Sequence, residues 1–522
     1  MGSRFLRTQR RPFPASSLWI VWWFAASVAA LPGTCFGDPF DKDVPVNKAL
    51  SDMPPRQGTS TTPSPTARQP QANPTPKNAR TSSPANRSLA DLTKDPPENG
   101  VQADDLVRPE FRPLQEIPAD VLQRSNVRLI RGKVLHLYTD LPSQPAVDEL
   151  PHVFELALPE WCAYFGIRAD RVDGWRVDGC LMRDKAPFEQ LGLLPRDLPN
   201  FLHGYAREQQ IWVLNQPSDY YTRHLILHEG THALMAAMLG GNGPTWYSEG
   251  MAEFFGTHRW SDGKLLTRII PQNRDDVPNW GRILLVQNSI KAGRILSLEQ
   301  VMQYGPTEHL KSEPYGWSWA AAYFLDQHPR TQRAFRELRQ FAPDSSLLFS
   351  QQFLERIKPD WRAISEDWRI FASQIDYGYD VVREQIEHRP ANPLPNGGAT
   401  VAIDSARGWQ STGIRLEAGK SYSVEAEGRF DLQTEPKRWT SEAGGITLHY
   451  HRGFPLGALL GAVCGNDEAE IPNLEPLNKP GLIGTGRSIR ISTSGILFLR
   501  INDWSRSLAD NQGRLAVRVK PQ

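Results

Sequence analysis

This chain of 522 residues has few cysteines, a small net charge and no long apolar run. Four cysteines exclude a scaffold held together by many disulfide bonds. The 59 basic and 58 acidic residues nearly cancel, which argues against a nucleic-acid binder that follows phosphates. A mean hydropathy of -0.47 and a single short apolar run exclude a polytopic membrane protein. At about 150 residues per domain, the length predicts two or three folded units.

The N-terminal residues have the charge order of an export signal. Several arginines, including Arg4 and Arg11, precede an apolar run over residues 18–31. This run is shorter than the about 20 residues of a membrane-spanning helix, so we predict a cleaved signal peptide over residues 1–37. The predicted location is secreted, periplasmic or in the cell envelope, with no membrane attachment after cleavage. A retained anchor is the alternative.

Residues 38–112 have too few apolar side chains to form a core. No aromatic residue occurs between positions 51 and 100, where proline, serine and threonine recur. Such a composition does not bury enough apolar surface to offset chain entropy. We therefore predict a disordered, proline-stiffened linker.

Regular hydrophobic spacing begins near Val127 and changes character near residue 390. The spacing predicts two strands, then helices, a strand over 210–214, and a helix over 219–239 that ends at Gly240. A Pro- and Gly-containing segment at 390–398 predicts a linker. Short alternating runs separated by turn residues then predict a β-sandwich. The predicted domains are 113–390 and 399–522.

The predicted helix over 219–239 carries an HExxH motif, His228-Glu229-Gly230-Thr231-His232. Residues four apart lie on one helix face, so both imidazoles can bind one metal ion. Glu229 lies beside them and can reach a water molecule at the metal. Met235 and Met238 occupy the positions where the extended metzincin motif requires glycine and histidine, which excludes that class.

A second helix supplies carboxylates. Glu249 and Glu253 lie one turn apart among apolar residues that include Trp246 and Phe254. A pair of glutamates four apart is most often a solvated helix face, but these neighbours favour a buried helix. Glu249 is the better third ligand, and Glu253 can accept the second ring N–H of a ligating histidine.

These motifs resemble the gluzincin superfamily of zinc metallopeptidases, and are closest to its peptidase MA-like branch. The matching pattern is HExxH followed by W-x-x-E-G-x-A-E, here residues 246–253. The resemblance implies an α+β zincin-like domain in which His228, His232 and Glu249 hold Zn²⁺ and Glu229 is the general base. It also implies an oxyanion-stabilising tyrosine, for which Tyr315 is the candidate. A core aromatic at a helix start is the alternative for Tyr315.

The predicted chemistry is hydrolysis of a peptide bond in a protein or peptide substrate. Two neutral imidazoles and one carboxylate leave a net charge of +1 at a zinc ion, which lowers the pKa of bound water toward about 7. Glu229 then takes a proton from the attacking water and delivers it to the leaving amine. We expect the strand over 210–214 to pair with an extended substrate.

Segments over 408–414, 455–461 and 501–503 follow one another in a characteristic order and spacing. In this they resemble the galactophilic soluble bacterial lectin fold, a galactose-binding-like or jelly-roll architecture, over nearly all of 399–520. That family binds sugar through Ca²⁺. The resemblance implies side-chain ligands at Asp503, Asp510 and Asn511, with Ser507 in place of a threonine and a carbonyl at Leu432. Oxygen donors of this kind suit calcium, but they also occur in ordinary polar turns. Residues 438–454, which would contact sugar, do not match, so galactose specificity is not implied.

Two interpretations follow from the sequence. The first is an exported zinc metallopeptidase whose sandwich directs it to a surface or a cell-surface glycan, with no nucleic-acid partner. The second is a non-catalytic cell-surface binding protein with a degenerate peptidase domain. Cys162 and Cys180 are close enough in sequence to form a disulfide.

Overall fold

The computed structural model describes residues 116–308, 311–465 and 474–522. The predicted signal peptide and the whole predicted linker over 38–112 lie outside these ranges. Among the described helices, none is long and apolar enough to cross a membrane. Cys162 and Cys180 are both free, so the expected disulfide is wrong.

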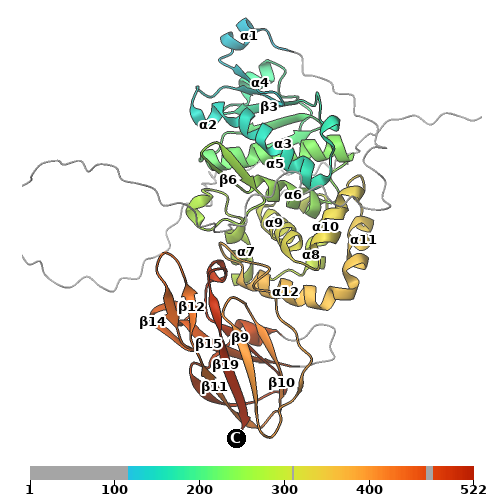
Figure 1. Cartoon of the computed structure of the whole chain (residues 1–522). Helices are drawn as coiled ribbons and strands as arrows, with labels where there is room; N and C mark the ends of the chain where they lie inside the picture. Colours follow the sequence, from blue (N-terminus) through green and yellow to red (C-terminus); the bar gives the residue numbers. More distant parts are fainter. Residues whose placement is uncertain (1–115, 309–310, 466–473) are drawn as a thin grey trace, which may run out of the picture. The chain divides into compact units, whose positions relative to one another are not determined.

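The first folded region contains a five-stranded mixed sheet (Figure 1). Three neighbouring strands, β2, β3 and β5, run parallel, and antiparallel edge strands flank them. In spatial order the strands are β1 (Arg128–Arg131), β2 (Leu135–Thr139), β3 (Val177–Met182), β5 (Gln210–Leu214) and β4 (Gly204–Arg207).

This order corrects one expectation. The strand predicted over 210–214 exists as β5, but it is hydrogen-bonded to β3 on one side and β4 on the other. Its backbone groups therefore have partners already, and β5 is not free to pair with a substrate. The strand at that edge of the sheet is β4, a short segment that the hydrophobic pattern did not predict.

Strand alternation explains why both faces of the sheet are covered. Leu137 and Val213 join the large core beneath α3 (Leu150–Phe165) and α5 (Asp219–Leu239). Their sequence neighbours Tyr138 and Trp212 point to the opposite face, where they form a smaller cluster with residues such as Phe188. The sheet is thus a central layer that holds α5 in place from one side.

Helix α5 has well-formed ends. The Ser218 side chain accepts a hydrogen bond from the Tyr221 backbone N–H, and Gly240 ends the helix with a left-handed φ of 77°. The observed bounds are those predicted.

Helix α6 (Thr245–Gly256) packs between α5 and α9 (Ser312–Gln327). A Cβ atom on Gly250 would lie 2.8 Å from the Ser318 carbonyl oxygen, so glycine permits this close approach. The remaining helices of this region are α1 (Ala119–Arg124), α2 (Pro145–Asp148), α4 (Ala186–Gln190), α7 (Arg282–Lys291), α8 (Leu298–Met302), α10 (Gln332–Glu337), α11 (Leu347–Ile357) and α12 (Trp361–Gln374). A hairpin of β6 (His258–Ser261) and β7 (Lys264–Thr267) follows α6.

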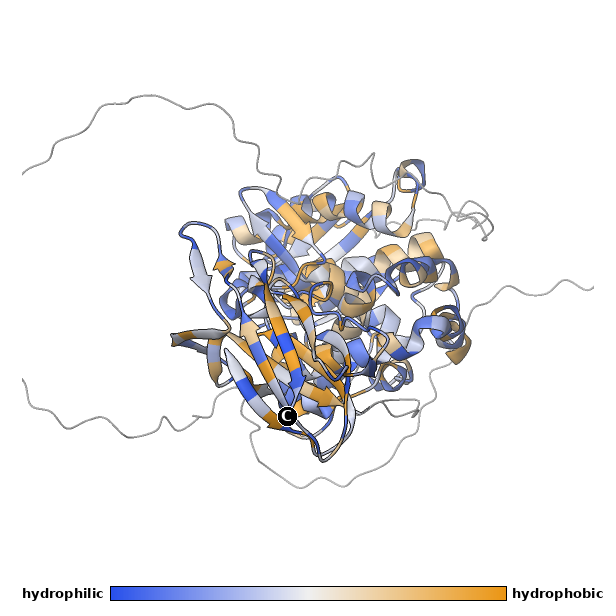
Figure 2. Ribbon diagram, turned by 60° about the horizontal axis from the view of Figure 1, so that its bottom comes forward, coloured by the Kyte–Doolittle hydropathy of each residue, from blue (hydrophilic) through white to orange (hydrophobic). Residues whose placement is uncertain are grey.

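The C-terminal region consists of two six-stranded sheets around a separate core, as expected of a sandwich. Hydrophilic and hydrophobic residues alternate along its strands (Figure 2), for example in β11, where every second residue from Tyr422 is buried. One sheet contains β8 (Asn392–Pro393), β10 (Gln410–Leu416), β14 (Gly444–His451), β15 (Phe454–Cys464), β16 (Gly481–Leu482) and β18 (Gly495–Ile501). The other contains β9 (Ala399–Asp404), β11 (Ser421–Glu427), β12 (Phe430–Gln433), β13 (Trp439–Ser441), β17 (Gly486–Arg490) and β19 (Gln512–Pro521). A short helix, α13 (Glu475–Asn478), precedes β16.

Strand β8 lies within the segment predicted as a linker. It pairs in parallel with β10, so residues 392–393 belong to the sandwich sheet. The domain boundaries 113–390 and 399–522 remain predictions from the sequence.

Candidate metal centre

Helices α5 and α6 bring three predicted zinc ligands together. His228 Nε2 lies 3.2 Å from His232 Nε2 and 3.3 Å from Glu249 Oε2, and His232 Nε2 lies 3.6 Å from the same oxygen. Tetrahedral zinc with bonds of about 2.0–2.1 Å separates its ligand atoms by roughly 3.3 Å. The three side chains are therefore already at the spacing that one small metal ion requires.

The donor atoms also lack other partners. Glu249 Oε2 is buried and accepts no hydrogen bond among the described residues. The side chains of His228, His232 and Glu249 are only 5%, 13% and 16% exposed. Burial alone would raise the pKa of Glu249, but His232 and His228 outweigh it and hold that pKa well below its usual range. A carboxylate kept ionised beside two imidazoles fits a divalent cation.

Each histidine has a group that orients its ring. Glu253 Oε1 lies 3.4 Å from His228 Nδ1, and Ser248 Oγ lies 3.3 Å from His232 Nδ1. In both rings the Nε2 atom is thereby left to face Glu249. The motif spacing predicted that Glu253 lies beside a histidine ring, whereas no sequence pattern pointed to Ser248, the residue directly before the predicted third ligand.

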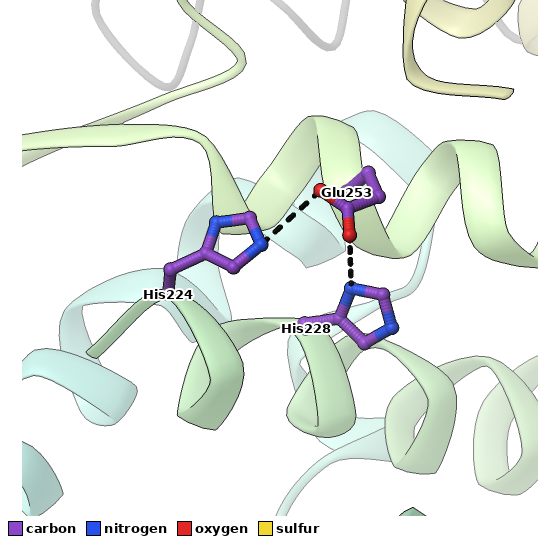
Figure 3. A group of neighbouring side chains, drawn as sticks. All are labelled: His224, His228 and Glu253. Atoms are coloured by element: carbon purple, nitrogen blue, oxygen red, sulfur yellow. Dashed lines mark ion pairs between the residues drawn. The ribbon is translucent and has the colours of Figure 1, made fainter. Parts of the chain in front are cut away.

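Glu253 is itself surrounded by donors (Figure 3). His224 Nε2 lies 3.2 Å from Glu253 Oε2, on the other side of the carboxylate from His228. The Arg282 guanidinium donates to both oxygens, over 2.7 and 2.8 Å. Burial alone would raise the pKa of Glu253, but Arg282 and His224 outweigh it and hold the pKa far below its usual range. The sequence analysis missed His224 and Arg282.

His224, His228 and Glu253 form a second group that has the donor types of a metal site. The Arg282 guanidinium binds both oxygens of the Glu253 carboxylate and already balances its charge, which disfavours a further cation at this second group. The first group, His228, His232 and Glu249, is therefore the candidate metal site, and the second group supports it.

Glu229, the predicted general base, lies against the edge strand. A Cβ atom on Gly204 in β4 would lie 2.9 Å from Glu229 Cδ and even closer to Oε1. Glycine at position 204 thus leaves room for the Glu229 carboxylate. Burial raises the pKa of Glu229, which suits a group that accepts and returns a proton.

Tyr315, the predicted oxyanion donor, lies near the candidate metal site. Its ring centroid is 6.2 Å from that of His228, and the side chain is half-buried near the start of α9. Burial, followed by the nearby Glu249 carboxylate, raises the pKa of Tyr315, so the phenol stays protonated and can donate a hydrogen bond. The role of Tyr315 as oxyanion donor or as a core aromatic at a helix start stays a prediction.

The predicted calcium residues of the sandwich lie on one loop between β18 and β19. Asn511 Nδ2 donates to Asp503 Oδ2 over 3.0 Å, and the Asp510 backbone N–H donates to the Ser507 carbonyl over 3.3 Å. The structure thus joins the side chains of Asp503 and Asn511 and the backbones of Ser507 and Asp510, and the ligand role of this set and of the Leu432 carbonyl stays a prediction.

Comparisons with known proteins find similarity over parts of the chain. A family model described as "Protein of unknown function (DUF1570)" matches residues 224–345, which include every predicted zinc-site residue and Tyr315. No curated protein matches the chain. Among solved structures, the chain is similar to "EclA N-terminal domain; PllA-like lectin", with 19% identity and a TM-score of 0.19, over 24% of this chain and 95% of that chain.

We predict that the purified chain binds one equivalent of Zn²⁺ through the first group. His228→Ala and His232→Ala should lose the metal, and Glu249→Gln should weaken binding by more than the about 10-fold that loss of a supporting group costs, because each changes a direct ligand. Metal content after dialysis and competition with a chelator measure this. His152→Ala, an exposed histidine on α3, is the control. Unchanged zinc binding in the His228 and His232 variants would contradict the assignment.

Proposed function

We propose that this protein is a zinc-dependent peptidase of the gluzincin type. The observation that supports the proposal best is the spacing of 3.2–3.6 Å among His228 Nε2, His232 Nε2 and Glu249 Oε2, beside the carboxylate of Glu229. Zinc, when bound there, would supply the Lewis acidity that peptide hydrolysis uses.

In this proposal, the protein's own groups move the proton and bind the carbonyl. Glu229 accepts a proton from the attacking water and passes it to the leaving nitrogen. The Tyr315 hydroxyl donates a hydrogen bond to the carbonyl oxygen as negative charge develops on it. Glu253 and Ser248 keep the two imidazole rings aligned during the reaction.

The substrate would bind along β4 rather than β5. Among the described residues β4 pairs only with β5, so its outer edge has unpaired N–H and C=O groups. An extended peptide can add to such an edge by backbone hydrogen bonds. Because Gly204 at the start of β4 contacts Glu229, a peptide on this edge would run past the general base.

Glu229→Gln should abolish hydrolysis while zinc stays bound. The amide keeps the shape of the side chain but accepts no proton, and the expected loss is about 10²- to 10⁴-fold in kcat. Cleavage of an unfolded protein and metal content measure the two effects. Zinc binding without cleavage in the wild-type chain would instead support the alternative, a non-catalytic scaffold.

Gly204→Ala should reduce hydrolysis without releasing zinc, because the added methyl group displaces the Glu229 carboxylate. We expect kcat to fall about 10- to 100-fold, equivalent to roughly 1.4–2.7 kcal/mol. Gly305→Ala is the matched control, since nothing lies within 4 Å of a Cβ atom at that position. Equal rates for the two variants would show that β4 does not constrain Glu229.

A second proposed activity is calcium binding by the loop that contains Asp503 and Asn511. Asn511 Oδ1 is buried and has no hydrogen-bond partner among the described residues, and the Asp503 side chain is almost fully buried. An oxygen without a donor beside a buried carboxylate is the environment that a hard cation satisfies. A sandwich loaded in this way would serve to bind a cell-surface glycan.

Calcium should stabilise the protein at neutral pH and much less at pH 5. Burial raises the pKa of Asp503 to about 6, so the folded state binds the extra proton and stability falls as pH rises from about 4 to 6. A bound cation offsets this loss only where Asp503 is ionised. The stabilisation by calcium is measured as the shift in the thermal unfolding temperature with CaCl₂, compared with MgCl₂, at both pH values. Asp503→Asn should remove both dependences, whereas Glu442→Gln, an exposed acid of the sandwich, should retain them.

A further inference from the structure

Arg282 is the most extensively bonded cation of the described residues around the metal centre. It is the first residue of α7, and its side chain lies almost fully inside the core. Nε and Nη2 bind the two Glu253 oxygens over 2.8 and 2.7 Å, and Nη1 donates to the Trp280 carbonyl over 2.7 Å. Every nitrogen of the guanidinium therefore has an acceptor.

The same guanidinium also faces the tyrosines of the site. Nη2 lies 3.2 Å from the Tyr221 hydroxyl, and the guanidinium carbon lies 5.5 Å from the Tyr221 ring centroid and 5.7 Å from that of Tyr315. Contacts of this kind between a cation and an aromatic face are attractive, most of all where water is excluded. One side chain thus touches both the group that orients His228 and the proposed oxyanion donor.

The position of Arg282 is itself fixed by packing. Gly281 directly before it has a left-handed φ of 64°, and Trp280 packs edge-on against Trp319 of α9 at 4.7 Å. A Cβ atom on Gly316 would lie 3.1 Å from the Arg282 carbonyl oxygen, so α7 and α9 approach closely at this point. Packing therefore fixes the backbone of Arg282, and its side chain has little freedom to move away from Glu253.

We propose that Arg282 is a positioning residue of the metal centre, which fixes Glu253 against the His228 ring and packs against Tyr315. The inference deepens the proposed function and rests on the metal binding that is part of it. Lysine does not replace arginine in this role, because one ammonium group does not reproduce the planar, two-point contact with a carboxylate. The residue acts through Glu253 and the aromatic rings rather than on the substrate.

The test compares Arg282→Lys with Arg336→Lys in the full chain. Arg336 is a matched control because it also makes a two-point contact with a buried carboxylate, Asp326, over 2.7 and 3.1 Å, and it contacts no proposed ligand. We expect Arg282→Lys to weaken zinc binding about 10-fold, as loss of such supporting groups typically does, and to shift the visible spectrum of the Co²⁺-substituted protein. Arg336→Lys should change neither.

A double-mutant cycle with Glu253→Gln shows whether Arg282 acts through that carboxylate. If it does, Arg282→Lys should weaken zinc binding far less in the Glu253→Gln background than in the wild type. Thermal unfolding confirms that each variant is folded before its zinc affinity is compared. This comparison uses only metal binding, so it does not depend on any peptidase substrate.

The outcomes separate the two proposals. Zinc affinity and a Co²⁺ spectrum in Arg282→Lys equal to those of Arg336→Lys would overturn the role of Arg282 and leave the peptidase proposal intact. Zinc binding without cleavage in the wild type would overturn the peptidase activity but not the role of Arg282. A wild-type chain that binds no zinc would overturn both.

Discussion

The metal centre depends on one buried charge, the carboxylate of Glu253. It has no exposed surface, and it receives hydrogen bonds or close contacts from α5, through His224 and His228, and from α7, through Arg282. An isolated carboxylate at such a depth would cost several kcal/mol, so its stability requires the cation beside it. The relative placement of the three helices therefore determines whether His228 points its Nε2 atom at the metal site.

Helix packing converts this electrostatic contact into a defined geometry. Gly250 allows α6 to lie close to α9, which brings Glu249 on one helix near Tyr315 on the other. The sheet supports the opposite side of α5 and supplies β4, whose Gly204 makes room for Glu229. The proposed ligands, base and oxyanion donor thus come from three helices, α5, α6 and α9, and glycines permit the close approach of α6 to α9 and of β4 to Glu229. The resulting arrangement is what the proposed hydrolysis requires.

The sequence predicted those residues of the site that lie on one helix, but not the contacts between elements that are distant in the chain. His228, His232 and Glu229 could be predicted because helical periodicity places them on one face whatever the rest of the chain does. The role of Gly204 could not be predicted, because the hydrophobic pattern of the four-residue strand β4 is too short to indicate a strand. Without β4 in the predicted sheet, β5 was expected at the edge, where a substrate could pair with it. Arg282 lies outside any motif, and its proposed role depends on the packing of α7 against α9, which brings the side chain to Glu253.

Two buried carboxylates in this chain have opposite environments, and the contrast explains their different proposed roles. Glu253 faces a guanidinium and two imidazoles, so its negative charge is stabilised and its pKa is lowered. Asp503 is bonded by an amide N–H and a backbone N–H, which do not offset burial, so its pKa is raised. A carboxylate already neutralised by the protein has no need of another cation and serves to position its neighbours. A carboxylate beside an unpartnered amide oxygen lacks a cation, and a metal ion would supply it.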